Sequence, residues 1–391
     1  MASAHTFIGE LLKKADIHIG GNRPQDIRVH DERFYNRVIR YGTLGLGESY
    51  MDGWWDSSAL DVFIHTVLMA RLDKVVQINF ASLLTIAKAF LFNLQSGKDA
   101  FNVGKVHYDL GNDLYEAMLG THMVYTCGYW SGTPRTQTLD EAQEAKLDLV
   151  CKKIRLKKGD HILDVGCGWG SFAKFAAEKY GASVVGITVS KEQAALAQKR
   201  CAGLPVEIRV QDYRNVNEKF DHIVSLGMFE HVGVKNYREY FTVANRCLKE
   251  KCLPDGRQGL FLLHTIGYKL SQLTSDPWIE KYIFPGGALP SLAQIGKATE
   301  GLFIVEDLHN FGADYDNTLM AWFTNFDAAW PALREKYALP GENFEHKGNR
   351  FYRMWKYYLL TCAGTFRARE AHLWQIVLSK NGVPGGYTSV R

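Results

Sequence analysis

From about residue 155 the chain alternates short apolar segments with amphipathic ones, and this alternation limits the fold more than any other feature. The apolar segments have the length of strands, and about ten to fifteen residues of helical character separate them. Strands connected in this way form right-handed crossovers. We therefore expect an α/β fold, a doubly wound and mostly parallel sheet with helices on both faces. The expected strands are 161–165, 183–188, 206–212, 221–226 and 259–267.

The first part of the chain has a different character and predicts a second, smaller domain. A length of 391 residues suits two or three domains. Residues 75–94 repeat apolar side chains with a helical period. We expect an N-terminal helical domain over 1–94, a linker over 95–104 and a catalytic domain over 105–391.

Two segments do not fit regular helices or strands. Residues 41–55 combine glycines with large aromatic side chains, which is typical of a structured turn or site-facing loop, or of a connection between helices. An insertion at about 268–300 contains proline and glycine and is long enough to act as a lid.

Composition excludes several classes of protein. The chain is 46% hydrophobic and 23% charged, which is ordinary for a globular protein and excludes disordered and fibrous ones. It contains no run of about 20 apolar residues that could span a membrane, and its first residues lack the features of a secretory signal. The seven cysteines form no CxxC pair and no metal-like cluster, so we expect reduced thiols, no metal and a cytoplasmic location.

A glycine loop at 166–170 ends the first expected strand and begins a helix, where backbone amides can approach an anion. A dinucleotide site would favour glycine at position 171 and an acid after the second strand. This chain has Ser171 and Thr188 there, which disfavours NAD. With Asp164 before the loop and Asp212 later, the loop is similar to the S-adenosylmethionine site of class I methyltransferases.

Polar residues also follow neighbouring expected strands. Glu230 and His264 stand where ligands bind in doubly wound sheets, beyond the carboxyl ends of the strands. Taken alone, Cys127 could be a small buried hydrophobe and Glu230 could pair with His231. Together beside a glycine loop, these residues favour a site. The motifs that contain such side chains are 107–113, 125–130, 227–233, 263–267 and 309–315.

These motifs resemble those of the cyclopropane fatty acid synthases. The resemblance covers nearly the whole chain, including the N-terminal module, which the mycolic acid branch of the family lacks. Thr126 and Gly128 depart from the family pattern, which usually has Ser and Ala at these positions. Threonine keeps the hydroxyl of serine, and glycine fits the space of alanine, so we expect no loss of function. The matching segments are 41–55, 107–113, 163–170, 225–233, 262–267, 276–287, 310–322 and 362–369.

The resemblance implies a cyclopropane-fatty-acyl-phospholipid synthase. Such an enzyme transfers a methyl group from S-adenosylmethionine to the cis double bond of a phospholipid acyl chain. The ring closes when the resulting carbocation loses a proton from that methyl carbon. Because the alkene is itself the nucleophile, the site needs dryness and aromatic faces more than it needs an activating base.

The resemblance also implies the site residues. A bound bicarbonate would accept the proton, and Glu230 would accept the hydrogen of the bicarbonate and relay it away. We do not expect Cys362 to be a nucleophile, because the mechanism needs no reactive thiol. The residues expected to hold bicarbonate are Cys127, Glu230, His264, Tyr315 and, through its backbone, Ile266. Those expected around S-adenosylmethionine are Tyr125, Thr126, Asp164, Gly166, Cys167, Gly168, Gly170, Asp212 near the adenine, Tyr213, and Thr188 and Gln193 near the ribose.

Charge placement predicts the partners. Residues 346–369 contain six Lys and Arg side chains and no acid, which suits anionic phospholipid headgroups. A solvated helix face and a nucleic-acid surface are the alternatives, but a nucleic-acid methylase would need neither the bicarbonate cluster nor the N-terminal module. An inactive lipid-binding protein would not need the catalytic residues. We expect a homodimer, peripherally associated with the inner face of the cell membrane through this patch and the helix at 75–94, and no nucleic acid.

Overall fold

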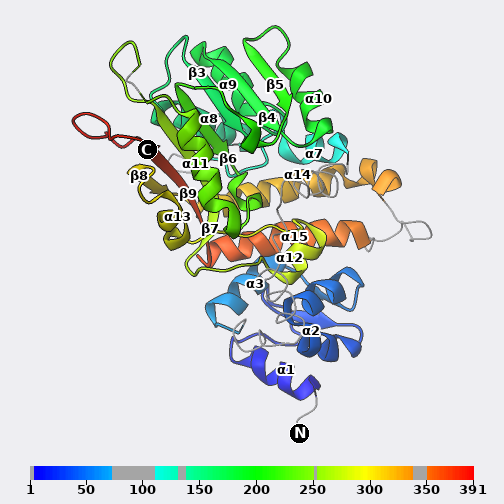
Figure 1. The fold of residues 1–391 in the computed structure, drawn as a ribbon. Coiled ribbons are helices and arrows are strands. Elements are labelled where there is room, and N and C mark those ends of the chain that lie inside the picture. The colour runs from blue at the N-terminus through cyan, green and yellow to red at the C-terminus, as the bar shows by residue number, and fades with distance from the viewer. Residues whose placement is uncertain (1–3, 73–110, 131–137, 251–252, 338–349) are drawn as a thin grey trace. The chain divides into compact units, whose positions relative to one another are not determined.

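The structure is a computed structural model, and it describes residues 4–72, 111–130, 138–250, 253–337 and 350–391. The chain forms two compact units, each assembled from separate stretches (Figure 1). The expected linker at 95–104 and helix at 75–94 lie outside the described residues, so the predicted domain boundaries stay a prediction. Unit 1 comprises Met1–Phe92, Thr274–Pro285 and Tyr315–Ala371, and unit 2 comprises Asn93–Leu273, Gly286–Asp314 and His372–Arg391.

Unit 2 contains a seven-stranded sheet with the order β5-β4-β3-β6-β7-β9-β8. The strands are β3 (His161–Val165), β4 (Ser183–Thr188), β5 (Val206–Val210), β6 (His222–Leu226), β7 (Leu260–Tyr268), β8 (Ile304–Asn310) and β9 (Ala371–Ser379). The pairs β5–β4, β4–β3, β3–β6 and β6–β7 are parallel, and the pair β9–β8 is antiparallel. All five predicted strands are confirmed to within two residues, whereas β8 and β9 were not anticipated.

Helices cover both faces of this sheet. They are α7 (Asn112–Leu119), α8 (Leu139–Lys153), α9 (Ser171–Tyr180), α10 (Lys191–Arg200), α11 (Tyr237–Cys247) and α13 (Leu292–Thr299). Leu163 and Val185 belong to the core that includes α11 and α13, whereas Ile162 and Val184 belong to the core that includes α8 and α9. Because successive strand residues point to opposite faces, the two cores lie on opposite sides of the sheet. The predicted doubly wound α/β architecture is confirmed.

Unit 1 is mainly helical. Its elements are α1 (Ala4–Lys13), β1 (Ile27–Val29), α2 (Arg33–Met51), β2 (Trp55–Ser57), α3 (Leu60–Met69), α12 (Pro277–Tyr282), α14 (Asp314–Tyr337), which begins at the last residue of a unit 2 stretch, and α15 (Arg350–Arg367). The strands β1 and β2 form a small antiparallel pair that the helical pattern did not predict. The insertion at about 268–300 contains α12, which belongs to unit 1, and α13, which belongs to unit 2. That this insertion acts as a lid stays a prediction. In the described part of the chain, no helix has the length and apolarity that crossing a membrane requires.

The glycine-rich segment 41–55 is largely part of α2, so its interpretation as a site-facing loop was wrong. The alternative, a connection between helices, agrees with the kink at Gly42, where two helical segments of α2 meet. Gly42 has a φ of 58° and bends the helix. Gly47 gives room to a neighbour, since a Cβ there would lie 2.4 Å from the Trp278 ring. These glycines serve a bend and a close contact, and the turn itself is limited to the residues around Gly53, which has a φ of 76°.

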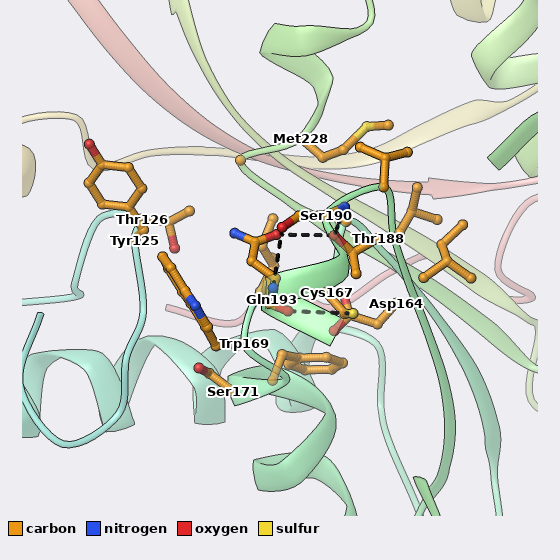
Figure 2. A pocket seen from close by; sticks show the side chains of 18 of the residues that line it. Tyr125, Thr126, Asp164, Cys167, Trp169, Ser171, Thr188, Ser190, Gln193 and Met228 are labelled. Atoms are coloured by element: carbon orange, nitrogen blue, oxygen red, sulfur yellow. Dashed lines mark hydrogen bonds between the residues drawn. The ribbon is translucent and has the colours of Figure 1, made fainter. Parts of the chain in front are cut away.

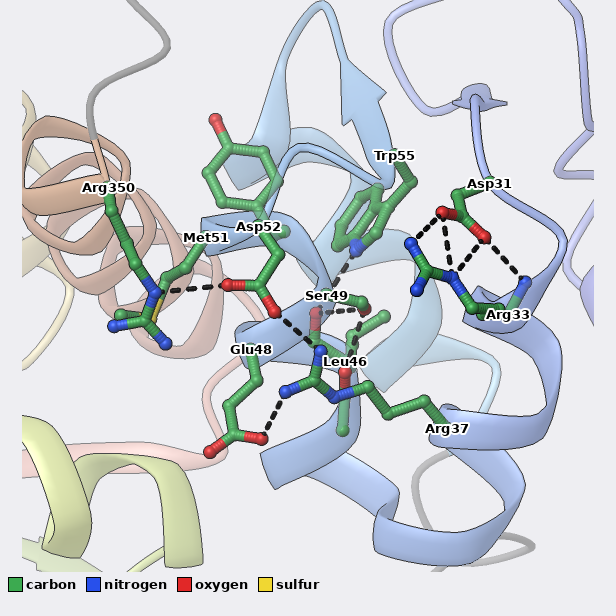
Figure 3. A network of polar contacts seen from close by, with 12 residues as sticks. Asp31, Arg33, Arg37, Leu46, Glu48, Ser49, Met51, Asp52, Trp55 and Arg350 are labelled. Atoms are coloured by element: carbon green, nitrogen blue, oxygen red, sulfur yellow. Dashed lines mark hydrogen bonds and ion pairs between the residues drawn. The ribbon is translucent and has the colours of Figure 1, made fainter. Parts of the chain in front are cut away.

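A network of ion pairs joins distant parts of unit 1 (Figure 3). Arg37 contacts Glu48 at 2.7 Å and Asp52 at 2.6 Å, and Arg350 contacts Asp52 at 3.0 Å. Burial would raise the pKa of Glu48, but hydrogen bonds from Lys281, Arg37 and Tyr282 outweigh it and lower the pKa to about 2. Glu48 is therefore ionised, and it connects α2 to α12.

The prediction of a headgroup patch at 346–369 was wrong for the three arginines of α15, because acids of unit 1 pair with them. Arg353 is buried and donates to the Trp55 carbonyl at 2.9 Å and to Asp56 at 2.8 Å. Arg367 pairs with Asp61 and Asp316, and Arg350 pairs with Asp52 as above. These three arginines form ion pairs with acids that are distant in sequence. Of the remaining basic residues, Lys356 and Arg369 are described and Lys347 lies outside the described residues.

Candidate active site

A pocket in unit 2 lies beyond the carboxyl ends of β3, β4, β5 and β6 (Figure 2). Ten of the eleven predicted cofactor residues line it: Tyr125, Thr126, Asp164, Gly166, Cys167, Gly168, Thr188, Gln193, Asp212 and Tyr213. The eleventh, Gly170, does not line it. Gly170 is the N-cap of α9 with a φ of 77°, and a Cβ there would lie 3.0 Å from the Cys201 sulfur. Gly170 instead allows the tight turn between β3 and α9.

The glycine loop needs glycine for two different reasons. Gly166, Gly168 and Gly170 all have left-handed φ values, which other residues adopt at a cost. A Cβ on Gly166 would lie 2.7 Å from the Met228 side chain, whereas a Cβ on Gly168 would meet no atom within 4 Å. Gly166 thus serves packing, and Gly168 borders the open pocket.

Polar side chains at the ends of β4 and β5 are held in place before any ligand arrives. The Thr188 hydroxyl donates to Gln193 Oε1 at 3.0 Å and accepts the Ser190 N–H at 3.2 Å (Figure 2). Asp212 accepts the backbone N–H of Arg214 at 2.9 Å and its guanidinium at 2.8 Å. This edge of the pocket is therefore rigid and presents oxygen atoms.

A buried lysine also lines the pocket, and sequence analysis missed it. Lys146 on α8 is fully buried, and its Nζ donates to Thr126 Oγ1 at 2.7 Å. Burial lowers the pKa of Lys146 to about 7, although Cys127 and Asp164 oppose this. Burial likewise raises the pKa of Asp164 to about 7, against the effect of Lys146. The capping box that starts α8 was a readable sequence signal for this helix, but no pattern shows which of its lysines is buried.

The structure brings four of the five predicted bicarbonate residues, Cys127, Glu230, His264 and Ile266, onto adjoining segments of unit 2. Gly227 donates its N–H to the His264 carbonyl at 2.9 Å, and a Cβ on Gly227 would lie 2.5 Å from the methyl group of Thr126, the neighbour of Cys127. The Ile266 N–H donates to Glu230 Oε1 at 2.7 Å. This N–H positions Glu230, so the direct contact of Ile266 with an ion stays a prediction.

Glu230 and His264 are buried with unused hydrogen-bonding atoms. Burial raises the pKa of Glu230 to about 7, and its Oε2 has no hydrogen-bond partner among the described residues. His264 Nδ1 lies 3.3 Å from the Gln375 side-chain nitrogen, an amide donor, which leaves the ring proton on Nε2. Nε2 also has no hydrogen-bond partner in the described part of the chain. Burial, together with Lys146 and Lys153, lowers the pKa of His264 well below its usual value.

Two further predicted residues lie in unit 1. Tyr315 begins α14, and its ring centroid is 4.4 Å from that of Phe366; its grouping with the residues of unit 2 stays a prediction. Cys362 lies on α15, where burial raises the pKa of its thiol to about 12 and so opposes thiolate formation. Residues 107–110 of the motif 107–113 lie outside the described residues.

Comparison with known proteins shows the family. Residues 95–376 match the family model described as "Mycolic acid cyclopropane synthetase". The chain belongs to the cyclopropane synthase family of S-adenosylmethionine-dependent methyltransferases. It is 52% identical over 382 residues to the cyclopropane-fatty-acyl-phospholipid synthase of Escherichia coli K12, covering 98% of this chain and 94% of that protein.

Other members and solved structures agree. The tuberculostearic acid methyltransferase of Mycobacterium tuberculosis is 33% identical over 365 residues, which is 89% of this chain and 81% of that protein. A mycolic acid cyclopropane synthase complexed with SAH and CTAB superposes with a TM-score of 0.63 at 31% identity, over 72% of this chain and 98% of that one. The class I methyltransferase fold predicted from the glycine loop is confirmed.

The raised pKa of Glu230 predicts how stability depends on pH. The native state holds this proton more tightly than the unfolded chain, whose glutamates titrate near 4.5. The stabilisation is therefore complete below pH 4.5 and is lost as the pH rises through about 7. Between these values the wild type should lose stability relative to Glu230→Gln, as measured by urea denaturation. The exposed Glu192→Gln is the control; if Glu230→Gln kept a constant offset from the wild type, the assignment of a raised pKa would be wrong.

Proposed function

We propose that this chain is a cyclopropane-fatty-acyl-phospholipid synthase that uses S-adenosylmethionine and closes the ring with the help of bound bicarbonate. The observation that carries the proposal is a buried carboxyl and a buried imidazole, Glu230 and His264, beside the glycine-loop pocket. Each has a polar atom without a hydrogen-bond partner among the residues that the structure describes. The relation to the Escherichia coli enzyme supports the substrate class.

The pocket suits S-adenosylmethionine. The N-terminus of α9 and the amides of the loop favour the carboxylate of the ligand, and Gly168 leaves space for its close approach. Thr188, Gln193 and Asp212 present oxygens that suit ribose and adenine. A member of the family with SAH (S-adenosylhomocysteine) bound supports this reading.

The buried cluster also fits bicarbonate. Bicarbonate has one hydrogen to donate and oxygens that accept, and the cluster offers an unused acceptor, Glu230 Oε2, and an unused donor, His264 Nε2. Cys127 and Tyr315 complete the proposed set. When bound, bicarbonate would supply a base that is small enough to reach the transferred methyl group.

The residues of the chain have three tasks in this reaction. The double bond attacks the methyl carbon, the bond from that carbon to sulfur breaks, and a carbocation remains on the acyl chain. The ring centroids of Phe311 and Tyr129 lie 5.3 Å apart, and that of His264 lies 5.9 Å from that of Phe311. In the proposed reaction this aromatic cluster excludes water and stabilises the cation with its π electrons. Glu230 then takes up the proton that leaves as the ring closes, since a carboxyl with a pKa of about 7 can both accept and release it.

Lipid analysis tests the reaction. A host that expresses the wild-type chain should accumulate phospholipids heavier by one methylene group whose acyl chains resist ozonolysis, because a ring has replaced the double bond. Glu230→Gln should slow turnover of the purified protein by about 10²–10³-fold, which corresponds to ~2–4 kcal/mol of lost transition-state stabilisation. Mass spectrometry measures both. Full activity of Glu230→Gln in carbonate-free buffer would contradict the proposed proton path, and unchanged host lipids would contradict the reaction itself.

Binding of the cofactor is tested at Gly168. The Gly168→Val variant should fold, because no atom of the described residues lies within 4 Å of the added Cβ, although the left-handed φ costs about 1–2 kcal/mol. Its side chain should occupy the space that the ligand needs and abolish SAH binding in calorimetry. Lys191→Ala, on the first turn of α10, is the control and should bind normally. Tight binding by a folded Gly168→Val would show that the ligand does not approach this loop.

The proposal includes a homodimer bound peripherally to the cytoplasmic face of the membrane, since the acyl chain must be reached without a membrane span. Light scattering should give the mass of two chains, and anionic vesicles should float with the protein at low salt and release it at high salt. A monomer that ignores anionic vesicles at low salt would contradict both parts.

A further inference from the structure

Helix α8 holds the pocket segment around Thr126 with two buried polar side chains. Gln143 donates its side-chain amide to the Thr126 carbonyl at 2.8 Å, and Lys146, about one turn later, donates to the Thr126 hydroxyl at 2.7 Å. Both side chains are fully buried. Helix α8 thus holds both the backbone and the side chain of Thr126.

The direction of the hydrogen bond determines what Thr126 can do. Because Lys146 Nζ donates to it, the Thr126 hydroxyl oxygen accepts, and the hydrogen of the hydroxyl is left for another acceptor. The methyl group of Thr126 faces Gly227, where a Cβ would lie 2.5 Å away, and this contact fixes the rotamer. Since Thr126 and Lys146 both line the pocket, the ligand is the acceptor within reach.

We propose that Lys146 is a positioning residue that makes the Thr126 hydroxyl a donor to the carboxylate of the amino-acid portion of the ligand. This rests on the proposed identity of the pocket as the S-adenosylmethionine site. A donor on the Thr126 oxygen strengthens the hydrogen bond that the hydroxyl can give to an anion. A carboxylate in the pocket would favour the charged form of Lys146, and the two charges would then complement each other at a buried position, where charge is otherwise costly.

The same helix offers a matched control. Lys153 follows Lys146 by two turns, is equally buried, and has a pKa that burial likewise lowers to about 7. Its Nζ lies 3.0 Å from His309 Nδ1, and it does not line the pocket. If removing any buried lysine from α8 weakened ligand binding, substitutions of Lys146 and of Lys153 would both do so. A specific effect on the ligand would appear only when Lys146 is replaced.

Calorimetry of the full-length chain with two ligands tests the inference. SAH carries the carboxylate, and 5′-methylthioadenosine lacks the whole amino-acid portion. Lys146→Met should weaken SAH binding by about 10- to 100-fold, the value of a hydrogen bond to a charged group, and leave 5′-methylthioadenosine unchanged. Lys153→Met should change neither. Thr126→Val should lose SAH affinity to the same extent, and Thr126→Ser should retain it.

Other outcomes would overturn the inference. Equal losses for both ligands would show that Lys146 only supports the fold, and unchanged SAH binding would show that the carboxylate lies elsewhere. If Lys146→Met did not fold, Thr126→Val would decide, because valine keeps the methyl contact with Gly227 and removes only the hydroxyl. A wild-type chain that bound neither ligand would instead overturn the proposed function on which this inference rests.

Discussion

Taking charged groups out of water is the costliest requirement in this protein, and each unit meets it in its own way. In unit 1 the buried Arg353 finds carbonyls and a carboxylate, so its charge is matched. In unit 2 Glu230 and His264 are buried with unused atoms, and their pKa values move toward the neutral forms. A buried polar atom without a hydrogen-bond partner costs stability. Where such atoms lie at the ends of strands, a bound ligand can supply the missing hydrogen bonds.

The ion pairs of unit 1 join the N-terminal stretch to α15. Asp56 and Asp61 come from the beginning of the chain, and their partners Arg353 and Arg367 come from α15, about 300 residues later. A Cβ on Gly364 would lie 2.5 Å from the Asp61 carbonyl, so α15 and α3 are in close contact. Removing the N-terminal stretch would leave the buried Arg353 without Asp56, and breaking a buried ion pair in this way is strongly destabilising. Whatever role the N-terminal stretch has, it is also part of the support of α15.

The sequence predicted those features that depend on local pattern. Parallel strands such as β3 and β4 are continuous apolar runs between helices, so their limits could be read directly. The segment 41–55 misled because a glycine that permits close packing, like Gly47, cannot be told from a glycine that permits a turn. The basic residues of α15 misled because the acids that neutralise them are distant in sequence. Lys146 was missed for the same reason: its burial depends on the tertiary position of α8.

The two departures from the family pattern, Thr126 and Gly128, are matched to their neighbours. The threonine methyl fits because position 227 has no Cβ, and a Cβ at position 128 would lie 3.0 Å from that of Ala142 on α8. The next residue, Tyr129, donates its N–H to the Ala142 carbonyl at 2.8 Å. Helix α8 therefore holds the chain on both sides of Cys127. Since Thr126 lines the pocket and Cys127 is its neighbour, a shift of α8 would move the two residues together.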